Sequence, residues 1–261
     1  MAASQWEKFP NPVKAHAYPG DALKKNWERL HRGDCEPFPD DEVVQDAWRL
    51  YHHGDFQAAY EKGISAGSVG HIVAAKSICI YADHLESDAV RKLELFQEAA
   101  DLCEALQAVN AKNANAFYLY ALAMGRYSQG ISIVKALAQG IGGKVKTALD
   151  KALQLAPKHA DAYAALGSYH AEIVEKVGAM VGRLTYGVSK DASVKHYETS
   201  LELAPNAPIG YLEYAKGLKA LYGRARREEI AALYEKAIAL KPLDAMDALD
   251  IRRAKRALDE A

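Results

Sequence analysis

The sequence predicts an all-α fold of stacked helical hairpins, and three observations carry that prediction. Alanine provides 48 of the 261 residues, whereas valine, isoleucine and threonine together number 29, a composition that favours helix over sheet. From Asp41 onward apolar residues recur three and four positions apart, with Gly, Asn or Pro interrupting the pattern about every 12–20 residues. One characteristic helix ending also occurs three times along the chain.

The first segment, residues 1–40, carries five of the nine prolines and is predicted to form an irregular strap with a short helix near 21–32. Its start lacks the apolar run of about seven residues that a signal peptide needs, and no stretch of about 18 apolar residues follows anywhere. The cysteines at 35, 79 and 103 form no close pair, so we expect Cys79 and Cys103 to be small buried apolar residues. These features favour a cytoplasmic protein without a membrane span.

The periodic segments after the strap predict a series of helices separated by short breaks. The expected helices are 41–53, 55–66, 69–85, 88–109, 113–128, 143–156, 159–176, 191–204, 208–222, 226–240 and 245–259. We divide the chain into the strap (1–40), a helical repeat domain (41–242) and a C-terminal capping helix (243–261). The polar last helix would close the repeat stack.

The repeated helix ending is seen when three segments are laid over one another. Residues 150–157 read DKALQLAP, residues 198–205 read ETSLELAP and residues 235–242 read EKAIALKP. In each, a small residue five positions before the proline lets a neighbouring helix approach closely, and a leucine two before the proline fills the core. The proline then prevents the helix from continuing. Each ending therefore marks the second helix of a hairpin.

The segment after each ending is also repeated, with an aromatic residue, then an apolar one three positions on, then a small one, all on one helical face. This pattern resembles the tetratricopeptide repeat (TPR) over roughly residues 41–242, most strongly from about residue 113. The matching residues are Tyr163, Leu166, Gly167, Tyr197, Ser200, Pro205, Tyr234, Ala237 and Pro242. The resemblance implies an α-solenoid of antiparallel helix hairpins.

The repeat lengths depart from the TPR pattern, because successive prolines lie 48 and 37 residues apart, whereas the family repeat has about 34. The extra residues fall in 129–143 and 177–191, which contain glycines and apolar residues, so two repeats are expected to be elongated. Elongated units of this kind resemble the C-terminal region of the regulator of microtubule dynamics family. That resemblance rests on Ser132-Ile133 through Gly140, Ala148–Pro157 and Leu166-Gly167.

The inserted segments leave two interpretations open. Residues 140–144, GIGGK, could hold an anion through backbone amides, but the P-loop pattern fails because Ala138 and Val145 stand where Gly and Ser or Thr are needed. A flexible connection within the hairpin is therefore the preferred interpretation. In residues 177–182 the glycines four apart favour close packing within the molecule. Together with the apolar residues of 131–141 this segment could instead form an apolar wall, which would be an interface if exposed.

Charge is distributed unevenly although its sum is only −1. Residues 67–111 carry 3 basic and 7 acidic side chains, whereas residues 112–158 carry 7 basic and one acidic. We therefore expect a solenoid with a positive middle, and the near-neutral total gives no reason to expect a nucleic-acid partner.

The TPR resemblance implies a ligand groove lined by the first helix of each hairpin. Carried onto this sequence, the groove residues are Asn115, Tyr118, Leu122, Arg126, Asp161, Ser168, Glu172, Lys216 and Lys219. Asn, Arg and Lys on rigid helices suit a peptide C-terminal carboxylate or acidic side chains. The alternative is a solvated surface with no dedicated ligand.

We find no pattern that predicts catalysis, a metal or a cofactor. Among the nine histidines, His159 and His170 could share a helical face only if their helix began before His159, and no nucleophile-elbow motif occurs.

The predicted function is a non-catalytic scaffold or adaptor that binds a protein or peptide in a concave, centrally basic groove. The alternative is a small-molecule or lipid binding protein that uses segments 129–143 and 177–191. The oligomeric state is left open.

Overall fold

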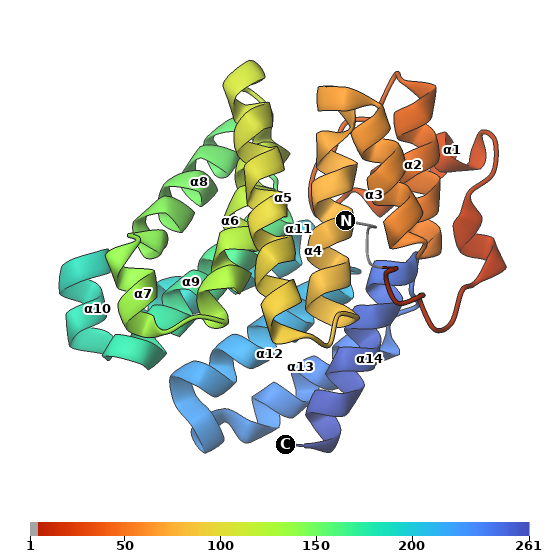
Figure 1. The fold of residues 1–261 in the computed structure, drawn as a ribbon. Helices are drawn as coiled ribbons and strands as arrows, with labels where there is room; N and C mark the ends of the chain where they lie inside the picture. Colours follow the sequence, from red (N-terminus) through yellow and green to blue (C-terminus); the bar gives the residue numbers. More distant parts are fainter. Residues whose placement is uncertain (1–4, 261) are drawn as a thin grey trace. The chain divides into compact units, whose positions relative to one another are not determined.

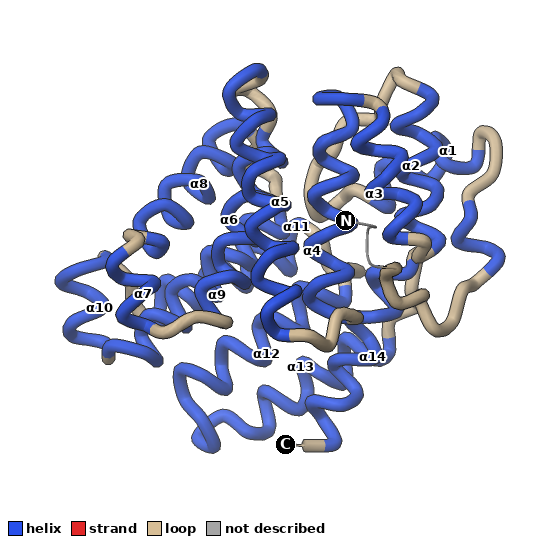
Figure 2. The backbone as a smooth tube through the Cα atoms, viewed as in Figure 1, coloured by secondary structure: helices blue, strands red, loops and turns tan. Residues whose placement is uncertain are grey.

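The structure is a computed structural model that describes residues 5–260. Residues 1–4 of the predicted strap and Ala261 of the predicted capping helix lie outside the described residues. The chain from 5 to 260 is made of helices joined by loops, with no strand (Figure 2). The all-α prediction is therefore confirmed.

Fourteen α-helices and three short 3-10 helices are formed by the described residues (Figure 1). The α-helices are α1 (Ala22–Leu30), α2 (Glu42–His53), α3 (Phe56–Ser65), α4 (His71–His84), α5 (Ala89–Val109), α6 (Ala114–Gln129), α7 (Ile133–Ala138), α8 (Ile141–Leu155), α9 (Ala160–Val177), α10 (Ala179–Tyr186), α11 (Lys190–Leu203), α12 (Pro208–Tyr222), α13 (Arg227–Ala239) and α14 (Ala245–Asp259). The 3-10 helices are η1 (Lys14–Ala17), η2 (Gly67–Gly70) and η3 (Gly223–Arg226).

Every helix predicted after residue 40 is present, with ends within two residues of those expected. Several of these boundaries are fixed locally by polar caps. The Asp41 carboxylate accepts hydrogen bonds from the amides of Val43 and Val44 at the start of α2, and Asp88 does the same for Arg91 in α5. Gly54 ends α2 in the left-handed conformation, with φ of 97°, which a residue with a side chain rarely adopts.

The interpretation of residues 140–144 as a flexible connection was wrong, and both inserted segments contain a short helix. Segment 129–143 contains α7, which Ser132 caps by accepting a hydrogen bond from the Lys135 amide, and α8 begins already at Ile141. Segment 177–191 contains α10, which is bounded by Gly178 and Gly187, both with positive φ. Each insertion is therefore a short helix set into the turn of a hairpin.

Contacts along the chain divide it into two compact units. Unit 1 comprises residues 5–31, Glu36–Leu155 and Asp244–Met246, and unit 2 comprises Arg32–Cys35, Ala156–Leu243 and residues 247–260. The division into strap, repeat domain and capping helix stays a prediction.

Unit 1 is a stack of three hairpins, α2–α3, α4–α5 and α6–α8, each helix packing on the next. The first helices also touch one another, α2 on α4 and α4 on α6. The N-terminal residues contribute aromatic side chains to this unit: Trp6 stacks on Tyr60 and Tyr81, with ring centroids 5.5 and 4.3 Å apart, and Trp27 meets Trp48 edge to face. The strap residues of unit 1 are thus part of its core.

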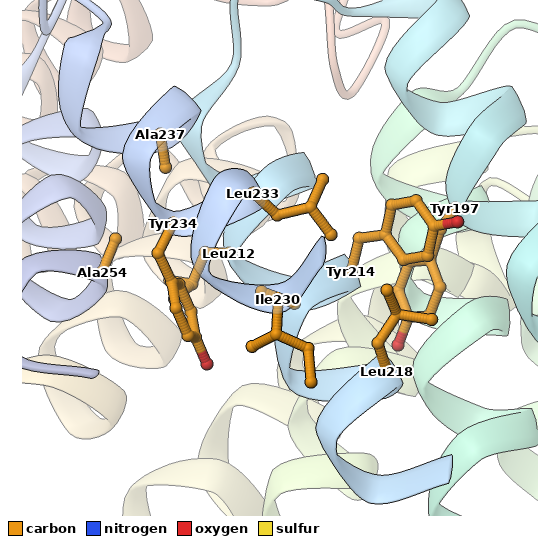
Figure 3. Packing of buried hydrophobic residues seen from close by; sticks show 10 residues of the cluster. Tyr197, Leu212, Tyr214, Leu218, Ile230, Leu233, Tyr234, Ala237 and Ala254 are labelled. Carbon is orange, nitrogen blue, oxygen red and sulfur yellow. The ribbon is translucent and has the colours of Figure 1, made fainter. Parts of the chain in front are cut away.

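Unit 2 contains the hairpins α9–α11 and α12–α13, with α9 also packed against α12. Its core is centred on Tyr197 of α11, which is 1% exposed and stacks on Tyr214 at a centroid distance of 5.0 Å (Figure 3). Glycines on both sides leave room for this ring, because a Cβ atom at Gly167 or Gly217 would clash with it. The repeated aromatic and glycine of the sequence are therefore partners in one contact.

The buried cysteines give a test of the packing in unit 1. Cys79 and Cys103 are buried, as expected from the sequence, whereas Cys35 is exposed. Burial raises the pKa of the Cys79 thiol to about 12, so it stays protonated. We expect maleimide to label one thiol in the native protein and three in denaturant, as counted by mass spectrometry. In Cys35→Ser no native adduct should form, and labelling of either buried thiol would contradict this packing.

Candidate functional site

The predicted groove residues lie on first helices of the hairpins, but in two different units. Asn115, Tyr118, Leu122 and Arg126 belong to α6 of unit 1. The other five belong to α9 and α12 of unit 2, namely Asp161, Ser168, Glu172, Lys216 and Lys219. The two faces are therefore separate candidate sites.

On α6, Asn115 is only 4% exposed and already has a partner from the N-terminal segment of its own unit. Its side-chain amide donates a hydrogen bond of 2.6 Å to the Oε2 atom of Glu36. The Trp27 indole N–H in turn donates to the Glu36 carbonyl oxygen at 2.7 Å, so this residue is held from two sides. The Asn115 side chain, which the TPR resemblance assigned to ligand binding, is therefore already hydrogen-bonded to the strap.

The remaining α6 positions are also engaged within the unit. The Arg126 guanidinium lies 3.6 Å from the Asp83 carboxylate of α4, and the arginine side chain is 15% exposed. Tyr118 is buried and Leu122 is half-buried. The Arg126–Asp83 pair ties α6 to α4 and reduces the charge that Arg126 offers to solvent.

At the start of α9 in unit 2, Asp161 lies against the short segment Arg32–Cys35. The Asp161 amide donates a hydrogen bond of 3.0 Å to the Gly33 carbonyl oxygen. A Cβ atom at Gly33 would clash with the Asp161 carboxylate, so glycine allows this close approach. Arg32 extends the contact by donating to the Leu203 carbonyl oxygen at 3.0 Å. The strap thus covers a second predicted groove position.

A polar cluster connects the three central helices of unit 2. The Ser168 hydroxyl of α9 lies 3.0 Å from the Tyr197 hydroxyl of α11 and donates to the Glu213 carboxylate of α12 at 3.2 Å. The Lys216 ammonium donates to the other oxygen of Glu213 at 2.8 Å. Glu213 is 8% exposed, whereas Lys216 is half-buried, so an acceptor and a cation are held side by side. We call Ser168, Glu213 and Lys216 the unit 2 polar cluster.

The surroundings of this cluster are electrostatically mixed. Lys219, one turn beyond Lys216 on α12, is exposed, and Glu172 of α9 lies 3.9 Å from Lys176. Burial, followed by the charge of Glu198, raises the pKa of the Tyr214 phenol to about 12, so this ring, which stacks on Tyr197, remains neutral. The arrangement offers hydrogen-bond donors and an acceptor on rigid helices.

Sequence reasoning missed two residues that organise these faces. Glu213 occupies no position that the TPR pattern assigns to the groove, although its spacing of three from Lys216 was a signal of an ion pair on one helical face. Glu36 could not have been found from sequence, because its contact with Asn115 joins residues 79 positions apart.

The histidines that could have suggested a metal site have other roles. His159 precedes α9 and its Nδ1 atom accepts a hydrogen bond from the Ala162 amide, so it caps the helix and does not share a helical face with His170. His170 accepts a hydrogen bond from the Ser189 amide through Nδ1 at 3.1 Å. Within residues 5–260, no group of three His, Cys, Asp or Glu side chains is arranged to hold a metal ion.

A search of residues 5–260 for membrane spans finds no helix with the length and apolar character to cross a bilayer.

Comparison with known proteins adds two findings. The family model described as regulator of microtubule dynamics protein 1-3 matches residues 71–249. Among solved structures, the chain is similar to a thermophilic TPR protein of Thermus thermophilus, with a TM-score of 0.58 and 17% identity. This likeness covers 82% of the present chain and 98% of the other, and it confirms the TPR-like helical repeat fold. The search of curated proteins returned no match.

Proposed function

Because the family model spans residues 71–249, this chain belongs to the regulator of microtubule dynamics protein 1-3 family, and we propose that it is a non-catalytic scaffold. In this proposal the first-helix faces bind a protein or peptide that carries acidic groups or a free C-terminal carboxylate. The observation that carries the proposal is the unit 2 polar cluster, since its donors and acceptor match what a peptide main chain and a carboxylate require.

The mechanism is pre-organisation of the binding groups. Lys216 and Ser168 both bond Glu213, and Tyr197 bonds Ser168 from below, so the cluster is already ordered before a ligand arrives. Little side-chain entropy is then lost on binding. Lys219 adds an exposed cation one turn away, which suits an acidic side chain or terminal carboxylate.

The proposed site is narrower than the groove that the sequence predicted. The Asn115 side chain donates to Glu36, and the Asp161 backbone amide donates to the Gly33 carbonyl oxygen, so both residues already contact the strap. Arg126 is paired with Asp83 in unit 1. We therefore place the recognition of the ligand at Ser168, Glu213, Lys216 and Lys219 of unit 2, and the remaining predicted residues form no part of this proposed site.

Binding to an array of acidic C-terminal peptides tests this proposal. In the double variant Lys216→Gln with Lys219→Gln we expect at least tenfold weaker peptide binding, because two cations are lost. The glutamine amide at position 216 can still donate a hydrogen bond to Glu213, so the helix packing should be kept. The matched control is Lys236→Gln with Lys241→Gln, two exposed lysines of the same unit on or after the second helix α13, which should bind as the unmodified protein does. Equal binding by both double variants would refute the proposed site.

The alternative function, small-molecule or lipid binding by segments 129–143 and 177–191, is less favoured. A carrier encloses its apolar ligand, whereas the large apolar side chains of α7 and α10 are exposed to solvent. Native mass spectrometry that detects a co-purified apolar ligand would favour this alternative over the scaffold.

A further inference from the structure

The two inserted helices expose apolar side chains to an unusual degree. Of the twelve exposed large apolar side chains among residues 5–260, three lie in α7 and three in α10, although these helices have only six and eight residues. Val134 is 72% exposed, Met180 76% and Leu184 81%. The other six are scattered singly along the chain, which is normal for a soluble domain, whereas a cluster on one helix requires an explanation.

The exposed residues of each helix have the same spacing. Ile133, Val134 and Leu137 of α7 stand at positions i, i+1 and i+4, and Met180, Val181 and Leu184 of α10 repeat that spacing. Positions so spaced share one face of an α-helix. Each inserted helix is thus amphipathic, with an apolar face that its own unit does not cover.

Gly182 shows why α10 turns this face outward. It is buried, and a Cβ atom there would lie 2.9 Å from Val188 and within 3.7 Å of Ile173 and Val177, so the glycine side of α10 is the side that packs on the unit. Gly182 is about 200° around the helix from Met180, at about 100° per residue. Met180 and Leu184 therefore lie on the face away from the packed side.

The charges beside both helices have one sign. The sequence from 105 to 149 contains no Asp or Glu. It carries the exposed Lys135, on the side of α7 away from its apolar face, and the exposed Lys144 in α8. The sequence from 176 to 190 also contains no Asp or Glu, and the exposed Arg183 stands next to Leu184 in α10. Both inserted helices therefore carry cations, and the local sequence around them has no acidic side chains.

We propose that α7 and α10 are interfacial elements that dock the protein on an anionic lipid membrane. Cations beside an exposed apolar face are the combination by which short amphipathic helices bind such surfaces, the cations meeting the headgroups and the apolar side chains entering the boundary of the acyl chains. Helices of six and eight residues are too short to span a bilayer, so they would lie in its plane.

The observations favour a membrane over a protein partner for a physical reason. A protein-binding face gains affinity from a pocket or groove that holds an anchor residue, whereas here the apolar side chains are themselves the exposed groups. A lipid surface accepts such side chains without a complementary shape. This docking is separate from the peptide site proposed on α9 and α12, so each can fail without the other.

Co-flotation of the full chain with vesicles tests the proposal. One set of vesicles contains phosphatidylcholine with about one third phosphatidylserine, and the other contains phosphatidylcholine alone. We expect binding to the anionic vesicles, weakening as salt is raised. Val134→Gln with Leu137→Gln in α7 should weaken it at least tenfold, and so should Met180→Gln with Leu184→Gln in α10. The matched control is Val69→Gln with Val90→Gln, which removes two exposed valines elsewhere in unit 1 and should leave binding unchanged.

A second measurement separates insertion from surface adsorption. Leu137→Trp and Leu184→Trp each place an indole on an inserted helix, and brominated lipid should quench it, whereas Trp6, Trp27 and Trp48 are buried in the protein. The proposal is overturned by absence of vesicle binding at low salt, by binding that the glutamine variants do not weaken, or by no quenching of either added indole. A dimer of the unmodified chain that these variants dissociate, without vesicle binding, would assign the faces to a second copy and would also overturn it.

Discussion

Tyr197→Ala is expected to lower the free energy of unfolding of unit 2 by about 3–5 kcal/mol, the range for removing a large buried aromatic side chain. The ring is 1% exposed, stacks on Tyr214 and is held between Gly167 and Gly217. Because helices α9 and α12 both approach this ring, neither can close the cavity without a shift of its backbone. Native-state hydrogen exchange of the amides in α9, α11 and α12 measures the loss where it occurs.

Two variants separate the contributions of Tyr197. Tyr197→Phe removes only the hydroxyl that lies 3.0 Å from the Ser168 Oγ atom and should cost about 1 kcal/mol. Tyr186→Ala changes a half-buried tyrosine of α10 in the same unit and should cost about 1 kcal/mol or less. If Tyr197→Ala were no more destabilising than Tyr186→Ala, the packing described for unit 2 would be wrong.

His52→Ala is expected to destabilise unit 1 by about 3–5 kcal/mol, because it breaks a buried polar pair and leaves a cavity among aromatic rings. The His52 Nδ1 atom lies 2.8 Å from the Asp244 Oδ2 atom, and the two side chains are 1% and 5% exposed. The imidazole also stacks on Trp48 at 5.7 Å. This pair joins α2 to a residue 192 positions away, so its loss releases a long-range contact.

The adjacent histidine provides a matched control. His53 follows His52 in the last turn of α2 but is half-buried, so His53→Ala should cost less than about 1 kcal/mol. A double-mutant cycle with His52→Ala and Asp244→Ala measures the coupling of the pair, which should be about 0.5–3 kcal/mol by chemical or thermal unfolding. A coupling of zero would mean that the two side chains do not interact in solution.

Much of the fold follows from local chemistry that the sequence displays. The ends of α12 and α14 coincide with those predicted, and α2, α5 and α6 begin at the polar residues Asp41, Asp88 and Asn113, whose side chains accept hydrogen bonds from the first turn. Such caps act within four residues, so they can be read from a short stretch of chain. Gly167 and Tyr197 were both identified as repeat positions, and the structure shows that they meet in one contact.

The candidate site was predicted less completely. Ser168 and Lys216 do converge, but on Glu213, which the groove pattern does not include. Two other predicted groove residues contact the strap, Asn115 through its side chain with Glu36 and Asp161 through its backbone amide with the Gly33 carbonyl oxygen. A helical repeat pattern states which face a side chain occupies, but it does not state whether another segment of the chain covers that face.

By itself, therefore, the sequence determined the helical class, the limits of the helices, the TPR-like hairpins and the place of the two insertions, because helix periodicity, caps and prolines are local properties. Only the tertiary structure decided that the strap contacts Asn115 and Asp161, that His52 pairs with Asp244 and that the inserted segments are helices with exposed apolar faces. Those features depend on which residues meet across long separations in the chain and on which surfaces are left uncovered once the helices have packed.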